Sequence, residues 1–309
     1  MQLFETAYFA KQKKGDKRVN YDELSKIQTS IYLAAGRKTQ NLLDGDYTSV
    51  YKGRSMEFDD LREYVVGDNI RDIDWKSSSR TGRILVRRNI AQKKHNVLFI
   101  LDSGKKMRAD TSTGDAKSDV AVTALGVLGF IVNRHGDDFT CLMGTEESIS
   151  YNFFRTGKNH LQNMLSEAEK EIVKDSRNSL NQLLSFTNNH IRRNKIIVII
   201  TDIDGLSTLD EDILKELTAV NDILLVNVDD AYLFGDDVFD VDSGRYEPDM
   251  VARQKRLRDA EKDARKKLIE KTEEILRRYK ITFVTVRSDE EAVDKIMELL
   301  EKHRYEIIR

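Results

Sequence analysis

The sequence predicts an α/β fold built on a doubly wound, mostly parallel sheet with an antiparallel hairpin at one edge. Segments at helical spacing alternate with short apolar runs, and this alternation favours parallel strands joined by crossover helices. Each run ends abruptly in polar turn residues, as buried strands do. The four runs are 96–102, 195–202, 222–229 and 281–286.

Two further runs, DFTCLMG at 138–144 and SISYNFF at 148–154, are separated by only three residues. A connection of this length is too short for the crossover helix that parallel strands require. We therefore expect these two runs to form the antiparallel hairpin.

The remaining segments define the expected domain organisation. Residues 1–95 have an amphipathic helical pattern at 21–35, followed by a Gly- and Arg-rich stretch, and are predicted to form an appended N-terminal subdomain. Residues 96–309 form the α/β domain. Pro248, the only proline, precedes a long amphipathic pattern and suits a helix start.

Composition excludes several function classes. The 309 residues carry 51 Lys+Arg and 53 Asp+Glu, a net charge of -2, so bulk charge attracts neither nucleic acid nor an anionic membrane. The basic run RTGRILVRR at 80–88 lacks an aromatic platform and is better explained as a strand with arginines on one face. The single cysteine, Cys141, excludes an intrachain disulfide. With no signal-peptide core and no apolar run long enough to span a bilayer, we expect a cytoplasmic protein.

Two aspartates end predicted strands and are the first candidate site. Ligands bind beyond the carboxyl ends of strands in open parallel sheets, where Asp102 and Asp202 are expected. Together with the hydroxyl of Thr156, they could hold a hard divalent cation. The alternative is that both aspartates simply cap helices or end strands.

The segment 53–89, with the following VLFILDSGKKM, resembles the bacterial domain-of-unknown-function 58 family. The resemblance covers roughly residues 25–205 and implies a von Willebrand factor A-like domain. The residues that carry it are Glu57, Phe58, Arg62, Tyr64, Gly67, Asp68, Arg71, Ile73, Asp74, Trp75, Lys76 and Arg80.

The metal loop of that family departs from its usual pattern in this chain. The family pattern Asp-x-Ser-x-Ser, a metal-ion-dependent adhesion site, becomes Asp102-Ser103-Gly104-Lys105-Lys106. Two hydroxyl ligands are lost, and an ammonium group repels Mg²⁺. We therefore expect a degenerate site without a bound cofactor, in which Lys106 or Lys105 stands where the cation would be.

The charged signature has two interpretations. Paired charges and a buried Trp75 would fasten the N-terminal subdomain to the sheet. Alternatively, the signature is a binding face. The residues concerned are Arg62, Tyr64, Gly67, Asp68, Arg71, Asp74 and Trp75.

The resemblance implies a non-enzymatic interaction or adaptor module beside a MoxR-type AAA+ ATPase, acting on client proteins in assembly or maturation. The chain has no G-x-x-x-x-G-K-[ST] loop of its own. One enzymatic alternative comes from IITDIDG at 199–205, which resembles haloacid dehalogenase-type phosphotransferases. In that reading Asp202 is the nucleophile and Asp204 the acid/base, but the acidic motif at 235–240 follows too soon for the intervening elements.

Overall fold

The structure is a computed structural model of the chain. It describes residues 61–68, 70, 73–87, 94–144, 148–174, 180–191, 194–231, 237–240, 245–248 and 255–308. The amphipathic pattern at 21–35 lies outside the described residues. The division at residue 95 therefore stays a prediction.

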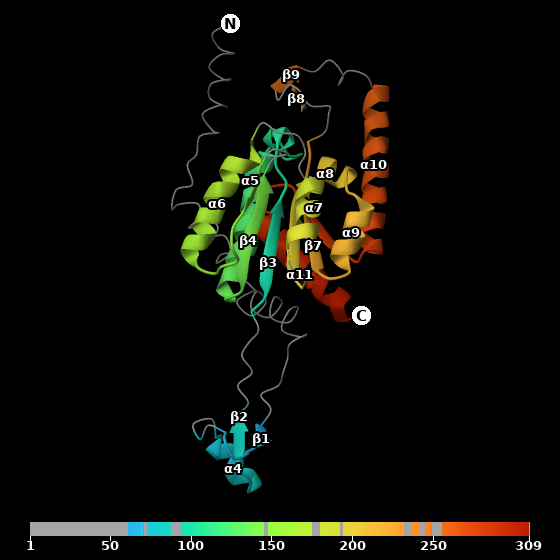
Figure 1. Ribbon diagram of the computed structural model, residues 1–309. Helices are drawn as coiled ribbons and strands as arrows, with labels where there is room; N and C mark the ends of the chain where they lie inside the picture. The colour runs from blue at the N-terminus through green and yellow to red at the C-terminus, as the bar shows by residue number, and fades with distance from the viewer. Residues whose placement is uncertain are drawn as a thin grey trace.

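A six-stranded sheet forms the centre of the α/β domain (Figure 1). Its order is β10-β7-β6-β3-β4-β5, and every neighbouring pair is parallel except β4 and β5. All four runs expected as parallel strands are in the sheet, so the doubly wound, von Willebrand factor A-like fold class is confirmed. The strands are β3 (Asn96–Leu101), β4 (Asp138–Gly144), β5 (Ile149–Tyr151), β6 (Ile196–Asp202), β7 (Asp222–Val228) and β10 (Thr282–Val286).

The expected hairpin is also confirmed at the sheet edge. Strand β5 pairs antiparallel with β4, with Leu142 opposite Tyr151 and Gly144 opposite Ile149. The chain therefore turns back after β4 and runs toward the end of the sheet from which β4 started.

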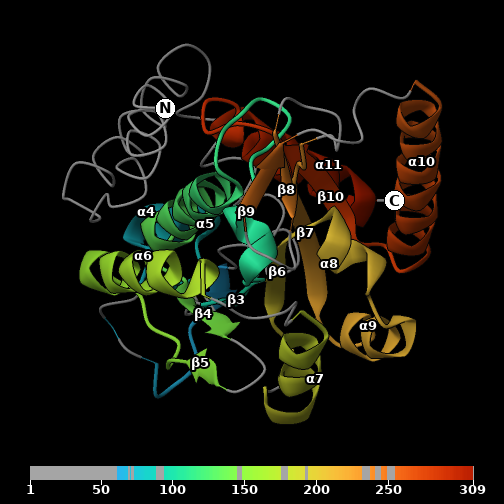
Figure 2. The same cartoon turned by 90° about the horizontal axis from the view of Figure 1, so that it is seen from above.

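Helices cover both faces of the sheet (Figure 2). Because side chains alternate across a strand, Phe99 and Leu101 pack into one core cluster, and Leu98 and Ile100 into the other. The first cluster faces α5 (Lys117–Arg134), α6 (Lys158–Ile172) and α11 (Ala292–Ile308). The second faces α7 (Leu180–His190), α8 (Ile203–Ser207), α9 (Glu211–Thr218) and α10 (Lys255–Arg278).

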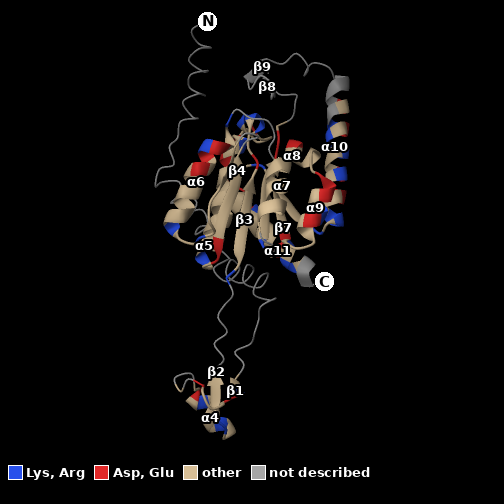
Figure 3. Cartoon of the chain, viewed as in Figure 1, with Lys and Arg blue, Asp and Glu red and all other residues tan. Residues whose placement is uncertain are grey.

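Charged residues follow this layering. In Figure 3 the Lys, Arg, Asp and Glu residues are concentrated on the helices and at the strand ends. The few charges that are buried at strand ends are therefore exceptional, and they form the candidate site. Among the described helices, none combines the length and the apolar character needed to cross a bilayer.

The segment around Pro248 differs from expectation. Pro248 ends strand β9 (Arg245–Pro248), which pairs with β8 (Asp237–Asp240), and the described part of α10 begins only at Lys255. Proline is compatible with this place because β9 pairs on one side only in a two-stranded sheet.

A small unit precedes the α/β domain. Strands β1 (Leu61–Glu63) and β2 (Leu85–Arg87) pair antiparallel, and helix α4 (Trp75–Thr81) lies between them in sequence. Asp74 begins α4 by accepting a hydrogen bond from the Ser77 backbone N–H, and Gly82 ends it in the left-handed region. The strand expected within RILVRR is thus confirmed.

Candidate functional site

Three aspartates lie at the carboxyl ends of three neighbouring strands. Asp102 follows β3, Asp202 is the last residue of β6, and Asp230 lies two residues beyond β7. Because these strands are adjacent and parallel, their carboxyl ends meet at the same edge of the sheet. Asp102 and Asp202 are fully buried, and the side chain of Asp230 is 15% exposed.

A lysine ammonium group joins the first two aspartates. Lys106 lies in the 3₁₀ turn η3 (Lys105–Arg108), and its side chain is only 4% exposed. Its Nζ donates to Asp102 Oδ2 at 2.6 Å and to Asp202 Oδ1 at 2.8 Å. The two carboxylates therefore share one fixed positive charge.

A second ammonium group extends the cluster. Lys117 is the first residue of α5, and its Nζ donates to Asp202 Oδ2 at 2.5 Å and also to Asp230 Oδ1. The five side chains form an alternating chain from Asp102 through Lys106, Asp202 and Lys117 to Asp230. With all five charged, three carboxylates meet two ammonium groups and the cluster carries one net negative charge.

The pKa values follow from this arrangement. Burial opposes the charge on both lysines, yet the neighbouring carboxylates raise the pKa of Lys106 and Lys117 above the usual lysine value. Burial likewise opposes the charge on Asp202, but two ammonium groups hold its pKa well below its usual range. Asp202 is therefore a carboxylate, and both lysines are cations.

The two outer aspartates behave differently. Burial raises the pKa of Asp102, which has one ammonium partner and lies beside the Asp202 charge. Burial also raises the pKa of Asp230 to about 6, despite Lys117 beside it. Because Asp202 already shares the Lys117 charge, this ammonium group does not offset the effect of burial on the pKa of Asp230.

Uncharged groups complete the cluster. Thr201 Oγ1 and the Ser103 N–H donate to the two oxygens of Asp102, at 2.6 and 3.0 Å. The Gly205 N–H donates to Asp202 Oδ1 at 2.9 Å. A Cβ atom at Gly205 would lie 2.5 Å from Asp102 Oδ2 and 2.9 Å from Lys106 Nζ, so only glycine fits there.

The structure brings together Asp102 and Asp202, as expected from the strand ends, and places Lys106 between them. The prediction that the Thr156 hydroxyl joins these two aspartates as a third ligand is wrong. This hydroxyl lies on the molecular surface and bonds to Asn133, near the end of α5, while Arg155 pairs with Phe139 at the start of β4. Because β5 is antiparallel, the chain has already returned to the amino ends of the strands when it reaches Thr156.

The alternative, in which the two aspartates only cap helices or end strands, is also partly confirmed. The Asp202 side chain caps α8 by accepting a hydrogen bond from the Gly205 N–H. Sequence reasoning missed Lys117 and Asp230. Asp230 could have been found as the second aspartate after the run DILLVNV, at the same edge as the other two. Lys117 had no comparable signal, because a lysine at the start of a helix is usually solvated.

The haloacid dehalogenase alternative finds no support in this geometry. Asp202 is fully buried, and its two oxygens are already bound by Lys106, Lys117 and the Gly205 N–H. Asp204, the expected acid/base, is exposed on α8. A nucleophile must be reachable by its substrate, and Asp202 is not.

The charged signature lies in the small unit before the sheet. Arg62 pairs with Asp68 within that unit, Gly67 has a φ of 110° in its turn, and Arg71 lies outside the described residues. The prediction of a buried Trp75 is wrong, since this residue is 66% exposed. Trp75 is the first residue of α4, a helix in which no residue is buried, so the indole has no core to enter.

The family model described as "Protein of unknown function DUF58" matches residues 60–233, more than half of the chain. The chain belongs to the DUF58 family. All five residues of the buried cluster, from Asp102 to Asp230, lie inside the matched segment.

Curated relatives of this DUF58 chain include the uncharacterized protein Mb1516 of Mycobacterium bovis and the uncharacterized protein Rv1480 of Mycobacterium tuberculosis. Each is 26% identical over 143 residues, which is 46% of this chain and 45% of the relative. The chain thus spans about half the length of the curated relatives it matches.

Solved structures with similarity to this DUF58 chain include BatB from Bacteroides thetaiotaomicron and a von Willebrand factor type A protein from Catenulispora acidiphila. BatB is 14% identical with a TM-score of 0.43, over 68% of this chain and 99% of that chain. The second is 12% identical with a TM-score of 0.40, over 71% of this chain and 44% of that chain.

Proposed function

We propose that this DUF58 chain is a non-enzymatic protein-interaction module, and that the ammonium group of Lys106 takes the place of a divalent cation in a degenerate metal-ion-dependent adhesion site. The observation that carries the proposal is the position of Lys106 Nζ, 2.6 Å from Asp102 and 2.8 Å from Asp202. A permanent charge from the chain itself then organises these loops without a metal.

The residues present do not fit a divalent cation. Mg²⁺ requires a near-octahedral shell of oxygen ligands, and an ammonium already donating to both carboxylates competes for the same oxygens. Gly104 brings no side-chain ligand, and Thr156 lies at the other end of the sheet. Lys117 adds a second positive charge next to Asp202, which disfavours a metal further.

The same arrangement argues against catalysis at this site. Every charged group in the cluster has an opposite charge as its partner, and four of the five side chains are at most 4% exposed. A buried network of paired charges stabilises one arrangement of loops but offers no reactive atom to a substrate.

Exposed apolar side chains on the small unit support an interaction role. Large exposed apolar side chains that lie within one short stretch of the chain are a candidate protein contact. These side chains, which we call the apolar face, are Val65, Val66, Ile70, Trp75 and Ile84. The proposed partner is a MoxR-type AAA+ ATPase, through the family resemblance, with client proteins recruited by the complex.

The test uses the purified full chain, immobilised, and a purified MoxR-type ATPase from the same cell. Biolayer interferometry with ADP, and then with a non-hydrolysable ATP analogue, should show association that is stronger in one nucleotide state. Trp75→Ala should weaken that association roughly tenfold or more, because exposed tryptophans are frequent interface anchors.

Phe153→Ala is the matched control, since Phe153 is 77% exposed but lies beside β5 rather than on the apolar face. It should leave the association unchanged. Absence of binding in every nucleotide state would contradict the partner assignment. Equal losses for Trp75→Ala and Phe153→Ala would contradict the apolar face.

A further inference from the structure

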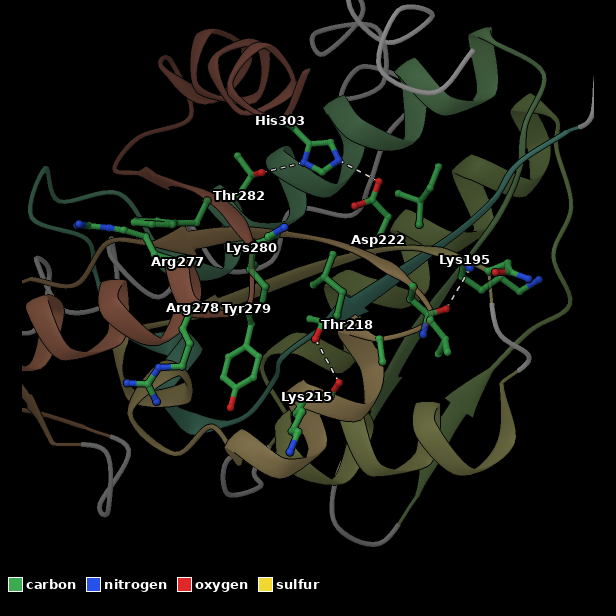
Figure 4. Close-up of a pocket in the computed structure, with 18 of the residues that line it drawn as sticks. Lys195, Lys215, Thr218, Asp222, Arg277, Arg278, Tyr279, Lys280, Thr282 and His303 are labelled. Atoms are coloured by element: carbon green, nitrogen blue, oxygen red, sulfur yellow. Dashed lines mark hydrogen bonds and ion pairs between the residues drawn. The ribbon is translucent and has the colours of Figure 1, made fainter. Parts of the chain in front are cut away.

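A second candidate site lies at the opposite end of the sheet from the buried cluster. A hollow of about 1290 Å³ is formed where β6, β7 and β10 begin and where α9 and α10 end (Figure 4).

The lining of the hollow is strongly basic. It contains one aspartate, Asp222, against six lysines and arginines. The basic residues come from four separate places in the chain: Lys195 before β6, Lys215 on α9, Arg277, Arg278 and Lys280 at the end of α10, and Lys302 on α11. This excess stands out in a chain whose net charge is only -2.

The single aspartate is already engaged. Asp222 Oδ2 lies 3.0 Å from His303 Nε2, and His303 Nδ1 lies 2.8 Å from Thr282 Oγ1. Figure 4 shows this Thr282–His303–Asp222 row together on one side of the hollow. One carboxylate on this side therefore faces six lysine and arginine side chains, so the lining keeps an excess of positive charge.

The basic side chains are available to a ligand to different degrees. Lys215 and Lys280 are exposed. Arg277, Arg278 and Lys302 pair with glutamates that do not line the hollow, in contacts that are largely exposed. Exposed ion pairs of this kind contribute little to stability, so an incoming carboxylate can replace the glutamates at small cost.

The backbone conformation of Lys280 independently supports a ligand site at this hollow. This residue has a φ of 55°, in the left-handed region that favours glycine, directly after α10. The Ile281 N–H bonds back to the Leu276 carbonyl, as expected where a helix ends in this conformation. A lysine at this position costs conformational energy that glycine would not, and its ammonium group at the hollow gives a reason for its presence.

The form of the hollow favours an extended ligand over a compact one. The labelled cations in Figure 4 are spread from Arg277 on one side to Lys195 on the other and do not converge on one point. Phosphate sites commonly use helix N-termini, whereas α9 and α10 present their C-terminal ends here. Tyr279 and Phe283 add aromatic surface between the charges.

We propose that this hollow binds an acidic segment of a partner protein, an extended stretch with several Asp or Glu side chains that pair with the basic residues of the lining. The hollow is separate from the apolar face and from the buried cluster, and its ligand need not be the ATPase. Binding here therefore goes beyond the function proposed above.

The test measures fluorescence anisotropy of a labelled peptide of alternating glutamate and serine, titrated with the purified full chain. A peptide with glutamine in place of glutamate is the control ligand. The acidic peptide should bind, the glutamine peptide should not, and affinity should fall as salt rises from about 0.02 M to about 0.15 M.

Two sets of variants locate the site. Lys215→Glu with Lys280→Glu should weaken binding roughly tenfold or more by reversing charge at the hollow. Lys266→Glu with Lys267→Glu makes the same change of charge on exposed residues of α10 that do not line the hollow, and should leave binding nearly unchanged. Equal losses for the two pairs would overturn the site.

Lys280→Gly separates binding from stability. It removes the ammonium and relieves the left-handed conformation, so peptide affinity should fall while the melting temperature stays the same or rises. Unchanged affinity would show that Lys280 has no part in binding. Competition by inorganic tripolyphosphate at far lower concentration than by the acidic peptide would replace the peptide proposal with a compact polyphosphate site.

Discussion

Lys106 Nζ and Asp102 Oδ2 are 2.6 Å apart in the interior of the protein, four residues from each other in the chain, at the end of β3. Asp202, from a strand far away in the sequence, completes the contact at 2.8 Å. The loop after β3 and the end of β6 are therefore held together by a charge that belongs to the chain.

Replacing Lys106 with methionine should destabilise the protein strongly. The apolar side chain keeps much of the volume but leaves Asp102 and Asp202 buried and facing each other, at an expected cost of about 3 to 5 kcal/mol in the free energy of unfolding. Urea denaturation measures this loss in the free energy of unfolding. Lys105→Met, at the half-buried neighbour, is the control and should cost less than about 1 kcal/mol. A comparable loss for both variants would contradict a specific role for Lys106.

Mg²⁺ should raise the melting temperature of a Lys106→Ser variant but not that of the natural protein. In Lys106→Ser the two carboxylates lose their shared cation and gain a hydroxyl, so Mg²⁺ can partly replace the ammonium and stabilise the folded state by binding to it. The melting temperature of Lys106→Ser should rise with millimolar MgCl₂, and that of the natural protein should not, relative to NaCl at equal ionic strength.

Serine at position 104 is unsuitable for this test, because Gly104 has a φ of 126° that a side chain would strain. Clear stabilisation of the natural protein by Mg²⁺ would contradict the degenerate site. Lys117 remains beside Asp202 in the single variant, so rescue should become stronger when Lys117→Ser is added.

Gly205→Ala should be destabilising even though alanine is the better helix former. In an exposed helix this change gains about 1 kcal/mol, but a Cβ at Gly205 would lie 2.5 Å from Asp102 Oδ2 and would also collide with Thr201 Oγ1. We expect a net loss of about 2 kcal/mol or more in the free energy of unfolding. Ser207→Ala, an exposed position on the same helix, is the control and should be nearly neutral. A stabilised Gly205→Ala protein would show that the cluster can move aside.

Asp230 should make stability depend on pH between about 4 and 6. Its folded-state pKa is about 6, above the usual value of 3.8, so the folded protein holds a proton that the unfolded chain has already lost. The contribution of Asp230 is therefore favourable below pH 4 and is lost as the pH rises through 6, on the order of 3 kcal/mol. Asp202 acts oppositely: its depressed pKa gives stability above pH 4 that is lost in stronger acid.

The measurement is urea denaturation of the natural protein and of Asp230→Asn from about pH 4 to pH 7. The difference in the free energy of unfolding between the two proteins should change across this window, because only the natural protein can release the Asp230 proton. Parallel curves would mean that Asp230 does not titrate there.

The sequence alone determined the sheet and part of the site. Runs such as 96–102 and 195–202 are so apolar that only a strand buried on both faces accommodates them, and the helical segments between them require parallel connections. The polar residue that ends each run must then lie at the carboxyl edge. For this reason Asp102 and Asp202 could be placed together. The family resemblance then indicated Lys106 or Lys105 as a substitute for the cation.

Only the tertiary structure decided which other side chains reach that edge. The start of α5 brings Lys117 against Asp202, over a separation of 85 residues that no local pattern encodes. The antiparallel β5 carries Thr156 away from the site, and the direction of one short strand decides this. Strand order sets which loops are neighbours, and burial among opposite charges then fixes the positions of the side chains in this cluster.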